Sequence, residues 1–267
     1  MMLGFKKILL NESADWAVLL HGFGGDCNVF HKQMAELSSR CNILLIDLPG
    51  HGNSEGLDRN KYDAMEIAEK VVEVLDRLQL SKVHIVAFSL GSIVANGVIG
   101  LAPERIKSVV LLGPVLGWKR WSRFLIRVSY KLRNFAPYMV FYKIFANILM
   151  PKKNHAKSRY YFIREATKLG RKEFMSWVHL IKRPEIPFLT TKKIKQSIPK
   201  QYIIGAEDHM FLAAAIKDAR DDKMTEIEIL ENTGHVCVLE NSKGTNEAMV
   251  KFLDKQMSES EKNKIAG

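Results

Sequence analysis

Short apolar runs alternate with longer segments of helical periodicity along most of this chain. Several of the runs are rich in β-branched residues, and most end at glycine, proline or aspartate, which favours buried strands. We predict strands at residues 3–10, 16–20, 43–46, 82–88, 108–112, 201–204 and 226–230. Runs that are apolar throughout, rather than alternating, are typical of parallel strands covered on both faces of a sheet.

The segments between these runs carry apolar residues three and four positions apart, as amphipathic helices do. The predicted helices are 26–40, 62–80, 90–101, 210–221 and 237–257, and the polar tail 258–267 is expected to fray. Strands that alternate with helices predict an α/β fold, with a mostly parallel central sheet flanked by helices.

The alternation stops between residues 116 and 198, where no strand is evident. Helical spacing marks 118–133, a strongly apolar segment follows at 137–150, and one or two helices follow at 158–182. The strands resume at residue 201. We therefore predict one α/β core, residues 1–115 and 199–267, interrupted by an all-helical insertion, residues 116–198.

The composition of the chain is that of a globular protein. Its 267 residues, 47% hydrophobic and 26% charged, are enough to bury a full core. Cys27, Cys41 and Cys237 are too few and too scattered for a disulfide framework or a metal site, and they favour a reducing compartment. No apolar run reaches the roughly 18 residues of a membrane span, and the apolar run near the N-terminus is too short for a signal peptide. We expect a cytoplasmic protein without a metal.

The net charge of +11 is unevenly distributed. Residues 118–200 contain 21 Lys and Arg and three acidic residues, a net charge of +18, whereas the rest of the chain carries −7. The same segment holds 15 of the 24 aromatic residues. A basic and aromatic surface of this kind points to a partner rather than to a fold.

Ser89 occupies an unusual position, between the apolar run 82–88 and the helical pattern that follows it. If the turn between them is tight, the hydroxyl stands exposed at its tip and the backbone is strained, as in a nucleophile elbow. That motif requires small residues two positions before and after the serine, and Ala87 and Gly91 occupy these places. Taken alone, the same pattern is compatible with an ordinary turn.

Three further polar groups follow predicted strands: the segment 21–25, the acidic pair Glu207 and Asp208, and His235. The carboxyl ends of parallel strands share one edge of a sheet, where ligands bind. A nucleophilic hydroxyl needs a base to accept its proton, and that base needs an acid to orient it. The chain offers serine, acid and histidine in this order, with both Glu207 and Asp208 open as the acid.

These motifs resemble those of the α/β-hydrolase family, over essentially the whole chain. The matching segments are His21-Gly22-Phe23-Gly24-Gly25, Asp47-Leu48-Pro49-Gly50-His51-Gly52-Asn53-Ser54, Ala87-Phe88-Ser89-Leu90-Gly91, Gly205-Ala206-Glu207-Asp208 and Gly234-His235. The resemblance implies Ser89 as the nucleophile, Asp208 as the acid and His235 as the general base, with no cofactor.

The resemblance also implies an oxyanion hole made by the backbone N–H groups of Phe23 and Leu90. Leu90 begins a predicted helix, so its amide is unpaired and the positive end of the helix dipole faces the site. Gly22 and Gly24 would let the first loop approach the substrate without a Cβ atom in the way. The variable helical lid of the family corresponds to the insertion, which then selects the substrate.

Other polar residues are expected to act less directly. We predict that His21, His51 and Asp47 shape loops through hydrogen bonds, and that His209 stands near a helix start. No sequence pattern indicates a role for the remaining histidines, which are His31, His84, His155 and His179.

The reaction that these residues favour is hydrolysis of a carboxylic ester with an apolar acyl group, such as a lipid or a monoacylglycerol, through an acyl-enzyme. The same triad serves thioesterases, acyltransferases, carbon–carbon bond hydrolases and a lyase-like enzyme, although Ser92-Ile93 stands where that lyase has Gly-Arg. A non-catalytic ligand-binding protein is a further alternative.

Three interpretations of the basic insertion stay open. It is a solvated face over an aromatic acyl pocket, a surface for peripheral contact with an anionic membrane, or a surface for an acidic carrier protein or a negatively charged substrate. Nucleic acid is not expected, because the chain contains no nucleic-acid-binding motif.

Overall fold

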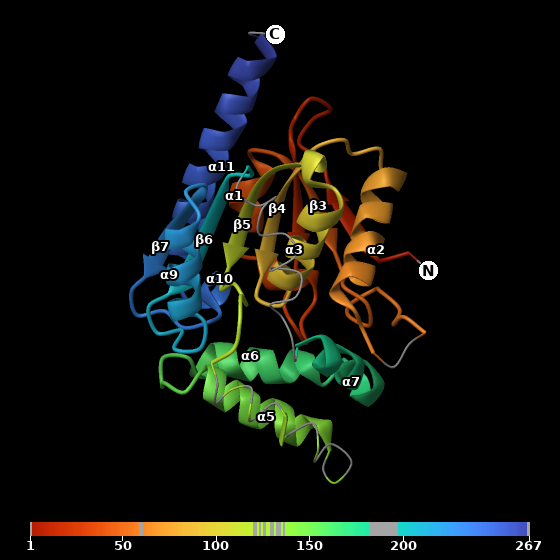
Figure 1. Cartoon of the computed structure of the whole chain (residues 1–267), viewed down its shortest axis with the longest axis vertical. Helices are drawn as coiled ribbons and strands as arrows, with labels where there is room; N and C mark the ends of the chain where they lie inside the picture. Colours follow the sequence, from red (N-terminus) through yellow and green to blue (C-terminus); the bar gives the residue numbers. More distant parts are fainter. Residues whose placement is uncertain are drawn as a thin grey trace.

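The computed structural model describes residues 2–58, 61–119, 122, 124, 127–128, 131, 135, 137–181 and 197–265. A central sheet is covered by helices on both faces, and further helices lie beyond one end of the sheet (Figure 1). No helix within these ranges is long and apolar enough to cross a membrane.

Seven strands form the sheet, in the order β1-β3-β2-β4-β5-β6-β7. They are β1 (Phe5–Ile8), β2 (Trp16–Leu20), β3 (Asn42–Ile46), β4 (Val83–Phe88), β5 (Ile106–Leu112), β6 (Lys200–Gly205) and β7 (Thr225–Leu230). β1 runs antiparallel to β3, and the other neighbouring pairs are parallel. β3, β4 and β6 are buried along their whole length, as parallel strands covered on both faces should be. The predicted fold class and all seven predicted strands are confirmed.

Two groups of helices cover the two faces of the sheet (Figure 1). The helices beside the sheet are α1 (Met34–Ser38), α2 (Ala64–Arg77), α3 (Gly91–Leu101), α9 (Leu212–Asp221) and α11 (Ser242–Ile265). The shorter elements η1 (Cys27–Phe30), η2 (Pro103–Arg105) and α10 (Cys237–Glu240) lie in the connections. α2 begins where the Asp63 carboxylate accepts the amide of Met65 at 2.8 Å, which is a standard N-cap. α2 packs closely on α3, because a Cβ atom at Gly97 would lie only 2.7 Å from that of Ala68.

The predicted helix 26–40 is wrong in its extent. It is divided into the 3₁₀ turn η1 and the short helix α1. The Asp26 carboxylate starts the turn by accepting the amide of Asn28 at 2.8 Å. The buried side chain of Gln33, just before α1, donates to the carbonyl of Val238 at 3.1 Å. A local cap and a bond to a distant segment therefore replace regular helical hydrogen bonding here.

The C-terminal prediction is also corrected. Residues 237–257 form two helices, α10 and α11, which are separated at Asn241, and the tail expected to fray is helical as far as Ile265. No glycine or proline interrupts the tail before Gly267, and its serine, glutamate and lysine residues are all compatible with a helix. The end of α11 projects beyond the rest of the molecule (Figure 1).

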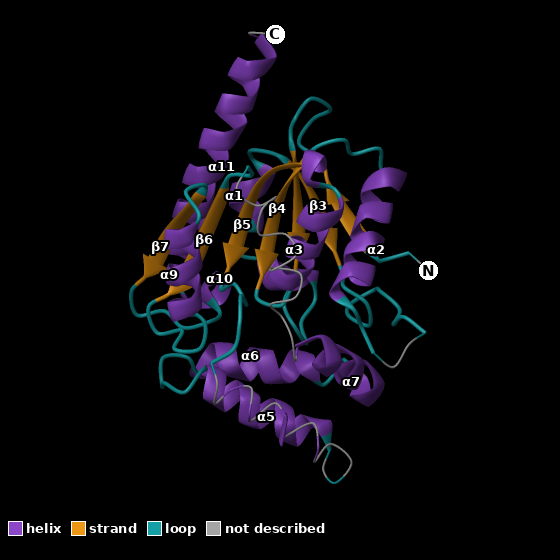
Figure 2. Cartoon of the chain, in the orientation of Figure 1, coloured by secondary structure: helices purple, strands orange, loops and turns teal. Residues whose placement is uncertain are grey.

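Between β5 and β6, the described residues form helices and no strand. These helices include α5 (Tyr138–Leu149), α6 (Ala156–Ala166) and α7 (Gly170–Ile181). They lie beyond the end of the sheet toward which the parallel strands point (Figure 2). We call residues 137–181 the cap. The predicted helix 118–133 falls largely outside the described residues, and the predicted boundaries of the insertion stay a prediction.

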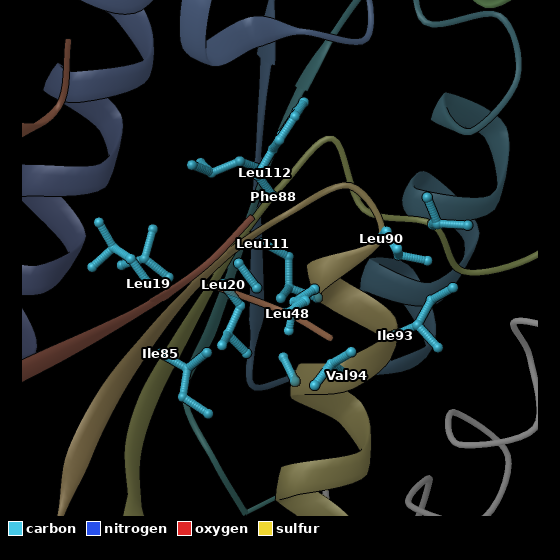
Figure 3. Packing of buried hydrophobic residues seen from close by; sticks show 14 of the residues in the cluster. Leu19, Leu20, Leu48, Ile85, Phe88, Leu90, Ile93, Val94, Leu111 and Leu112 are labelled. Atoms are coloured by element: carbon cyan, nitrogen blue, oxygen red, sulfur yellow. The ribbon is translucent and has the colours of Figure 1, made fainter. Parts of the chain in front are cut away.

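A dense cluster of buried apolar residues surrounds the junction of β4 and α3. Its members include Leu19, Leu20, Leu48, Ile85, Phe88, Leu90, Ile93, Val94, Leu111 and Leu112 (Figure 3). The start of α3 also lies against the end of β2 at Gly91, where an added Cβ atom would overlap the carbonyl oxygen of Leu20. Because a close-packed core tolerates little displacement, this cluster fixes the turn between β4 and α3.

Candidate active site

Ser89 lies in the turn between Phe88, the last residue of β4, and the start of α3. Its φ angle is +50°, a left-handed conformation that costs residues other than glycine roughly 1–2 kcal/mol. The Ser89 amide donates to the carbonyl of Leu112 at 2.9 Å, and the Ser92 hydroxyl donates to the Ser89 carbonyl at 2.6 Å. These bonds hold the hydroxyl at the tip of a strained turn, as a nucleophile elbow requires.

Two hydrogen bonds join Ser89, His235 and Asp208. Oγ of Ser89 lies 2.8 Å from Nε2 of His235, and Nδ1 of His235 lies 2.7 Å from Oδ2 of Asp208. The second oxygen of Asp208 accepts the amides of Met210 and Phe211 at 3.2 and 3.1 Å. Since the carboxylate accepts from Nδ1–H, the lone pair on Nε2 is available to the serine hydroxyl.

The site is nearly closed to solvent. Ser89 is 8% exposed, His235 1% and Asp208 0%. The imidazole of His235 packs against the rings of Phe88 and Phe211, with centroids 5.8 and 5.1 Å away. Hydrogen bonds in such a low-dielectric setting are stronger than in water, and the aromatic walls restrict the orientation of the imidazole.

The loop after β2 lies directly against Ser89. A Cβ atom at Gly22 would stand 3.2 Å from Cβ of Ser89 and 3.0 Å from the ring of Phe88, so glycine permits this approach. Phe23 follows in the same loop, and Leu90, which follows Ser89, is the N-cap residue of α3. The two backbone segments therefore flank the hydroxyl, and the donor role of their N–H groups stays a prediction.

Two buried histidines and Asp47 hold the neighbouring loops. Nε2 of His21 accepts the amide of Leu48 at 2.9 Å, and Nε2 of His51 accepts that of Gly24 at 3.0 Å. Burial lowers the pKa of both imidazoles, so they remain neutral, as an accepting nitrogen requires. Asp47 accepts two further loop amides. The loop-shaping roles predicted for these three residues are confirmed.

The family model for the alpha/beta hydrolase fold matches residues 16–242, a stretch that includes Ser89, Asp208 and His235. This chain belongs to the alpha/beta hydrolase family. A crystal structure from a study of carboxylesterases of Nitrososphaera gargenis superposes on this chain with a TM-score of 0.80 over 96% of each chain, at 16% identity. At that identity the likeness shows the shared fold.

Two curated relatives of this alpha/beta hydrolase have names that refer to esters or acyl groups. The dihydrolipoyllysine-residue acetyltransferase component of the acetoin cleaving system of Pseudomonas putida is 29% identical over 246 residues, which are 89% of this chain and 63% of that protein. The pimeloyl-[acyl-carrier protein] methyl ester esterase of Aeromonas hydrophila is 37% identical over 93 residues, 35% of each protein. The matches thus span less than two thirds of either relative.

Glu207, the second candidate for the acid, points away from the imidazole of His235 and toward the cap. Its carboxylate accepts from the amide of Asn154 at 2.9 Å and lies 2.8 Å from Nε2 of His155 and 2.9 Å from Nζ of Lys152. The hydrogen bonds from Asn154 and Lys152 lower the pKa of Glu207 to about 2. Glu207 therefore anchors the cap to the loop that follows β6.

Sequence reasoning missed His155, which is fully buried. Nε2 of His155 contacts Glu207 and also lies 3.9 Å from the carboxylate of Glu240. That carboxylate accepts the amide of Gly234, next to His235, at 2.6 Å. His155 thus joins the cap to both loops that carry the polar site. Its partners lie far away in the sequence, so no local spacing marks it.

Aromatic residues of the cap pack on the core loops. The hydroxyl of Tyr142 donates to the carbonyl of Phe23 at 3.1 Å, and the ring of Phe174 lies 5.6 Å from that of Phe23. The indole N–H of Trp177 donates to the carbonyl of Pro49 at 2.9 Å. The aromatic content of the insertion therefore serves, in part, to hold the loop that carries Phe23.

The remaining polar candidates lie apart from Ser89. His209 stands in the turn before α9, close to the helix start predicted for it. Cys27, Cys41 and Cys237 are free buried thiols whose pKa burial raises to about 12. A thiol with such a pKa is a poor nucleophile near neutral pH. Within the described ranges, no group of three His, Cys, Asp or Glu is arranged to hold a metal ion.

Proposed function

We propose that this alpha/beta hydrolase is a serine hydrolase that cleaves carboxylic esters through an acyl-enzyme. The observation that carries the proposal is the pair of hydrogen bonds joining Asp208 to His235 and His235 to Ser89. The left-handed backbone of Ser89 and its position between the two loop segments support the same role. The relative named as a methyl ester esterase supports the reaction class.

In the first half of the reaction, Oγ of Ser89 attacks the carbonyl carbon while Nε2 of His235 accepts its proton. Asp208 holds the imidazole in the required tautomer and stabilises the imidazolium. The negative charge on the carbonyl oxygen is received by the N–H groups of Phe23 and Leu90, and a single donor of this kind typically contributes roughly 3–4 kcal/mol. His235 then gives its proton to the departing alcohol.

In the second half, water replaces the alcohol. His235 accepts a proton from the water as it attacks the acyl group on Ser89, and a second tetrahedral intermediate collapses to the free acid. Ser89 recovers its proton from His235. The buried setting of the three side chains keeps competing water away from their hydrogen bonds.

Labelling with a fluorophosphonate probe tests the proposal. We expect the unmodified protein to be labelled and Ser89→Ala to be unlabelled, and we expect the hydrolysis of p-nitrophenyl butyrate by Ser89→Ala to fall by about a millionfold, to background. Circular dichroism checks that the variant is folded.

Ser176→Ala is the matched control, because Ser176 is also a buried serine, on α7, and does not line the cavity beside Ser89. It should keep the label. Labelling of Ser89→Ala at the level of the unmodified protein would remove Ser89 from the role of nucleophile and the serine-hydrolase proposal with it.

A second candidate function is acyl transfer, in which an acceptor other than water receives the acyl group. It is favoured by the relative from Pseudomonas putida, which is named as an acetyltransferase component and matches 89% of this chain. Matched oxygen and thioesters, assayed with and without an added alcohol or thiol acceptor, separate the two. Hydrolysis predicts free acid as the main product, whereas acyl transfer predicts that the acceptor captures most of the acyl group.

A further inference from the structure

A cavity of about 410 Å³ lies between the loop after β2 and helix α6, a size within the usual range of ligand pockets. Gly22 lines this cavity and also packs against Ser89, since a Cβ atom there would lie 3.2 Å from Cβ of Ser89. Val236, the neighbour of His235, lines it as well. Residues that adjoin Ser89 and His235 therefore line the cavity, although these two side chains themselves do not.

The part of the cavity nearest to Ser89 is apolar. Phe23 and Phe88 line it from the core, and Phe162 lines it from α6. Phe162 is stacked on Tyr142, with ring centroids 4.8 Å apart, and the hydroxyl of Tyr142 is bonded to the carbonyl of Phe23. These mutual contacts give the aromatic wall a defined shape that accommodates a short hydrocarbon segment.

The charges at one end of the cavity compensate each other. Glu165 of α6 lines this end, and its carboxylate binds both the guanidinium of Arg164, at 2.7 Å, and the ammonium of Lys168. Asp26, Glu165 and Lys168 also line a second cavity of about 330 Å³, which places them where the two cavities adjoin. With two carboxylates against two cations, this end offers little excess charge.

The opposite end contains two lysines. Lys157 precedes Glu165 by eight residues on α6, roughly 12 Å along the helix axis. The start of α6 is held near Gly234, because a Cβ atom at Gly234 would lie 2.8 Å from the ring of His155. Lys32 reaches the same region, since its ammonium donates to the carbonyl of Leu239 at 3.0 Å.

Among the described side chains, neither lysine at this end is engaged in an ion pair, because the nearby carboxylates of Glu207 and Glu240 contact Lys152 and His155 instead. Lys157 is exposed and lines the cavity. The only acidic side chains that line the cavity within the described residues, Asp26 and Glu165, belong to the other end. A negatively charged ligand group would find two ammonium groups here.

We propose that this cavity binds the part of an ester substrate that carries a negative charge, with Lys157 and Lys32 contacting that charge and the aromatic wall contacting an apolar spacer. The inference rests on the proposed esterase function and names its substrate class: an ester with a carboxylate or phosphate group a short hydrocarbon chain away from the scissile carbonyl. The apolar acyl chain expected from the sequence is then the spacer rather than the whole group.

Matched esters test this inference. p-Nitrophenyl hexanoate is compared with the mono-p-nitrophenyl ester of adipate, which has the same chain length and a terminal carboxylate. We expect a higher kcat/KM for the adipate ester. An ester whose acyl chain ends in a phosphonate shows whether one or two negative charges are preferred. A second pair, phenyl hexanoate and 4-carboxyphenyl hexanoate, shows whether the charge belongs to the acyl group or to the alcohol.

Variants assign the preference to residues. Lys157→Met should lower kcat/KM for the charged ester about fivefold, the effect of one partly exposed ion pair, and Lys157→Glu should lower it further, while the neutral ester changes less than twofold. Lys32→Met should act in the same direction. Lys143→Met is the control, because Lys143 is an exposed cap lysine that does not line the cavity. It should leave the ratio of the two esters unchanged.

Equal losses for charged and neutral esters in Lys157→Met, or the same change in Lys143→Met, would overturn the inference. A wild-type protein that hydrolyses the neutral ester in a Ser89-dependent way without preferring the charged one would also overturn it, and would leave the proposed function intact. Calorimetry with Ser89→Ala measures binding without turnover. Monomethyl adipate should bind this variant more tightly than methyl hexanoate. Equal affinities would contradict the inference, whatever the activity of the protein.

Discussion

Ser89 has a backbone conformation that its own side chain does not favour. A φ of +50° is imposed by its surroundings, namely the close contact of Gly91 with the carbonyl of Leu20 and the hydrogen bond from Ser92. Ala87, where the elbow motif usually has glycine, is fully buried within β4. The strand accommodates the extra methyl group in the core, so the departure from the motif has no visible effect on the turn.

The acidic pair after β6 shows why adjacent residues take different roles. The amide of Asp208 donates to the carbonyl of Gly205 at 3.0 Å, and the amide of Glu207 donates to that of Thr233 at 2.8 Å. The turn made by these bonds directs one carboxylate to His235 and the other to the cap. The residues alone left both acids open, and the family resemblance favoured the one that the structure places against the imidazole.

Replacing each of the two acids by its amide should therefore have very different effects on kcat. Asp208→Asn should lower kcat for p-nitrophenyl butyrate by roughly 10⁴, because asparagine favours the wrong tautomer of the imidazole. Glu207→Gln should change kcat less than tenfold, since its carboxylate does not reach His235. Steady-state kinetics of both variants checks this, and similar losses in the two would contradict the assignment of Asp208 as the acid.

The helices that agree best with their prediction have a regular apolar pattern and few polar contacts with distant segments. α2 keeps its predicted buried face, with Ile67, Val71 and Val74 fully buried. The segment 26–40 has apolar spacing too, yet it breaks before α1, where Gln33 bonds to Val238, 205 residues away. The apolar periodicity of a segment indicates which of its faces is buried. It does not indicate a hydrogen bond to a distant carbonyl, such as that of Gln33.

The attachment of the cap to the β6 loop should weaken in acid. Hydrogen bonds from Asn154 and Lys152 hold the pKa of Glu207 at about 2, below its ordinary value of 4.5. An acid whose pKa is lower in the folded state stabilises that state above the unfolded pKa, and this contribution disappears as the pH falls from about 4.5 through about 2.

Thermal melts of Glu207→Gln check this pH dependence. The difference in Tm between the unmodified protein and the variant should be largest near pH 6 and should vanish toward pH 2. Glu228→Gln is the control, because Glu228 is exposed on the edge strand β7, and it should show little pH-dependent difference. A Tm difference for Glu207→Gln that persists unchanged to low pH would contradict the role of this carboxylate.

At the scale of the whole molecule, charge is divided between a basic middle segment and an acidic remainder, +18 against −7. The described cap lies over the carboxyl end of the sheet (Figures 1 and 2), and Ser89 directly follows the carboxyl end of β4. Basic residues near the entrance of a site raise the local concentration of anions and accelerate their encounter.

This arrangement predicts a salt effect that depends on the substrate. Raising the ionic strength from about 0.01 M to about 1 M shortens the screening length from roughly 30 Å to roughly 3 Å. We expect kcat/KM for the adipate ester to fall severalfold over this range, while that for p-nitrophenyl hexanoate changes less than twofold. An equal salt effect on both esters would show that the basic cap does not steer anionic substrates.

The sequence by itself determined the succession of strands and helices along the chain, the fold class, and Ser89 and His235 as candidates for the chemistry. These properties depend on local patterning and on motifs at strand ends, which parallel topology brings to one edge. Only the tertiary structure decided which acid meets His235, that His155 ties the cap to both loops, and that Lys157 and Lys32 line the same cavity. Each of these depends on distances between segments far apart in the chain, and such distances are set by how the cap packs on the core rather than by any spacing along the sequence.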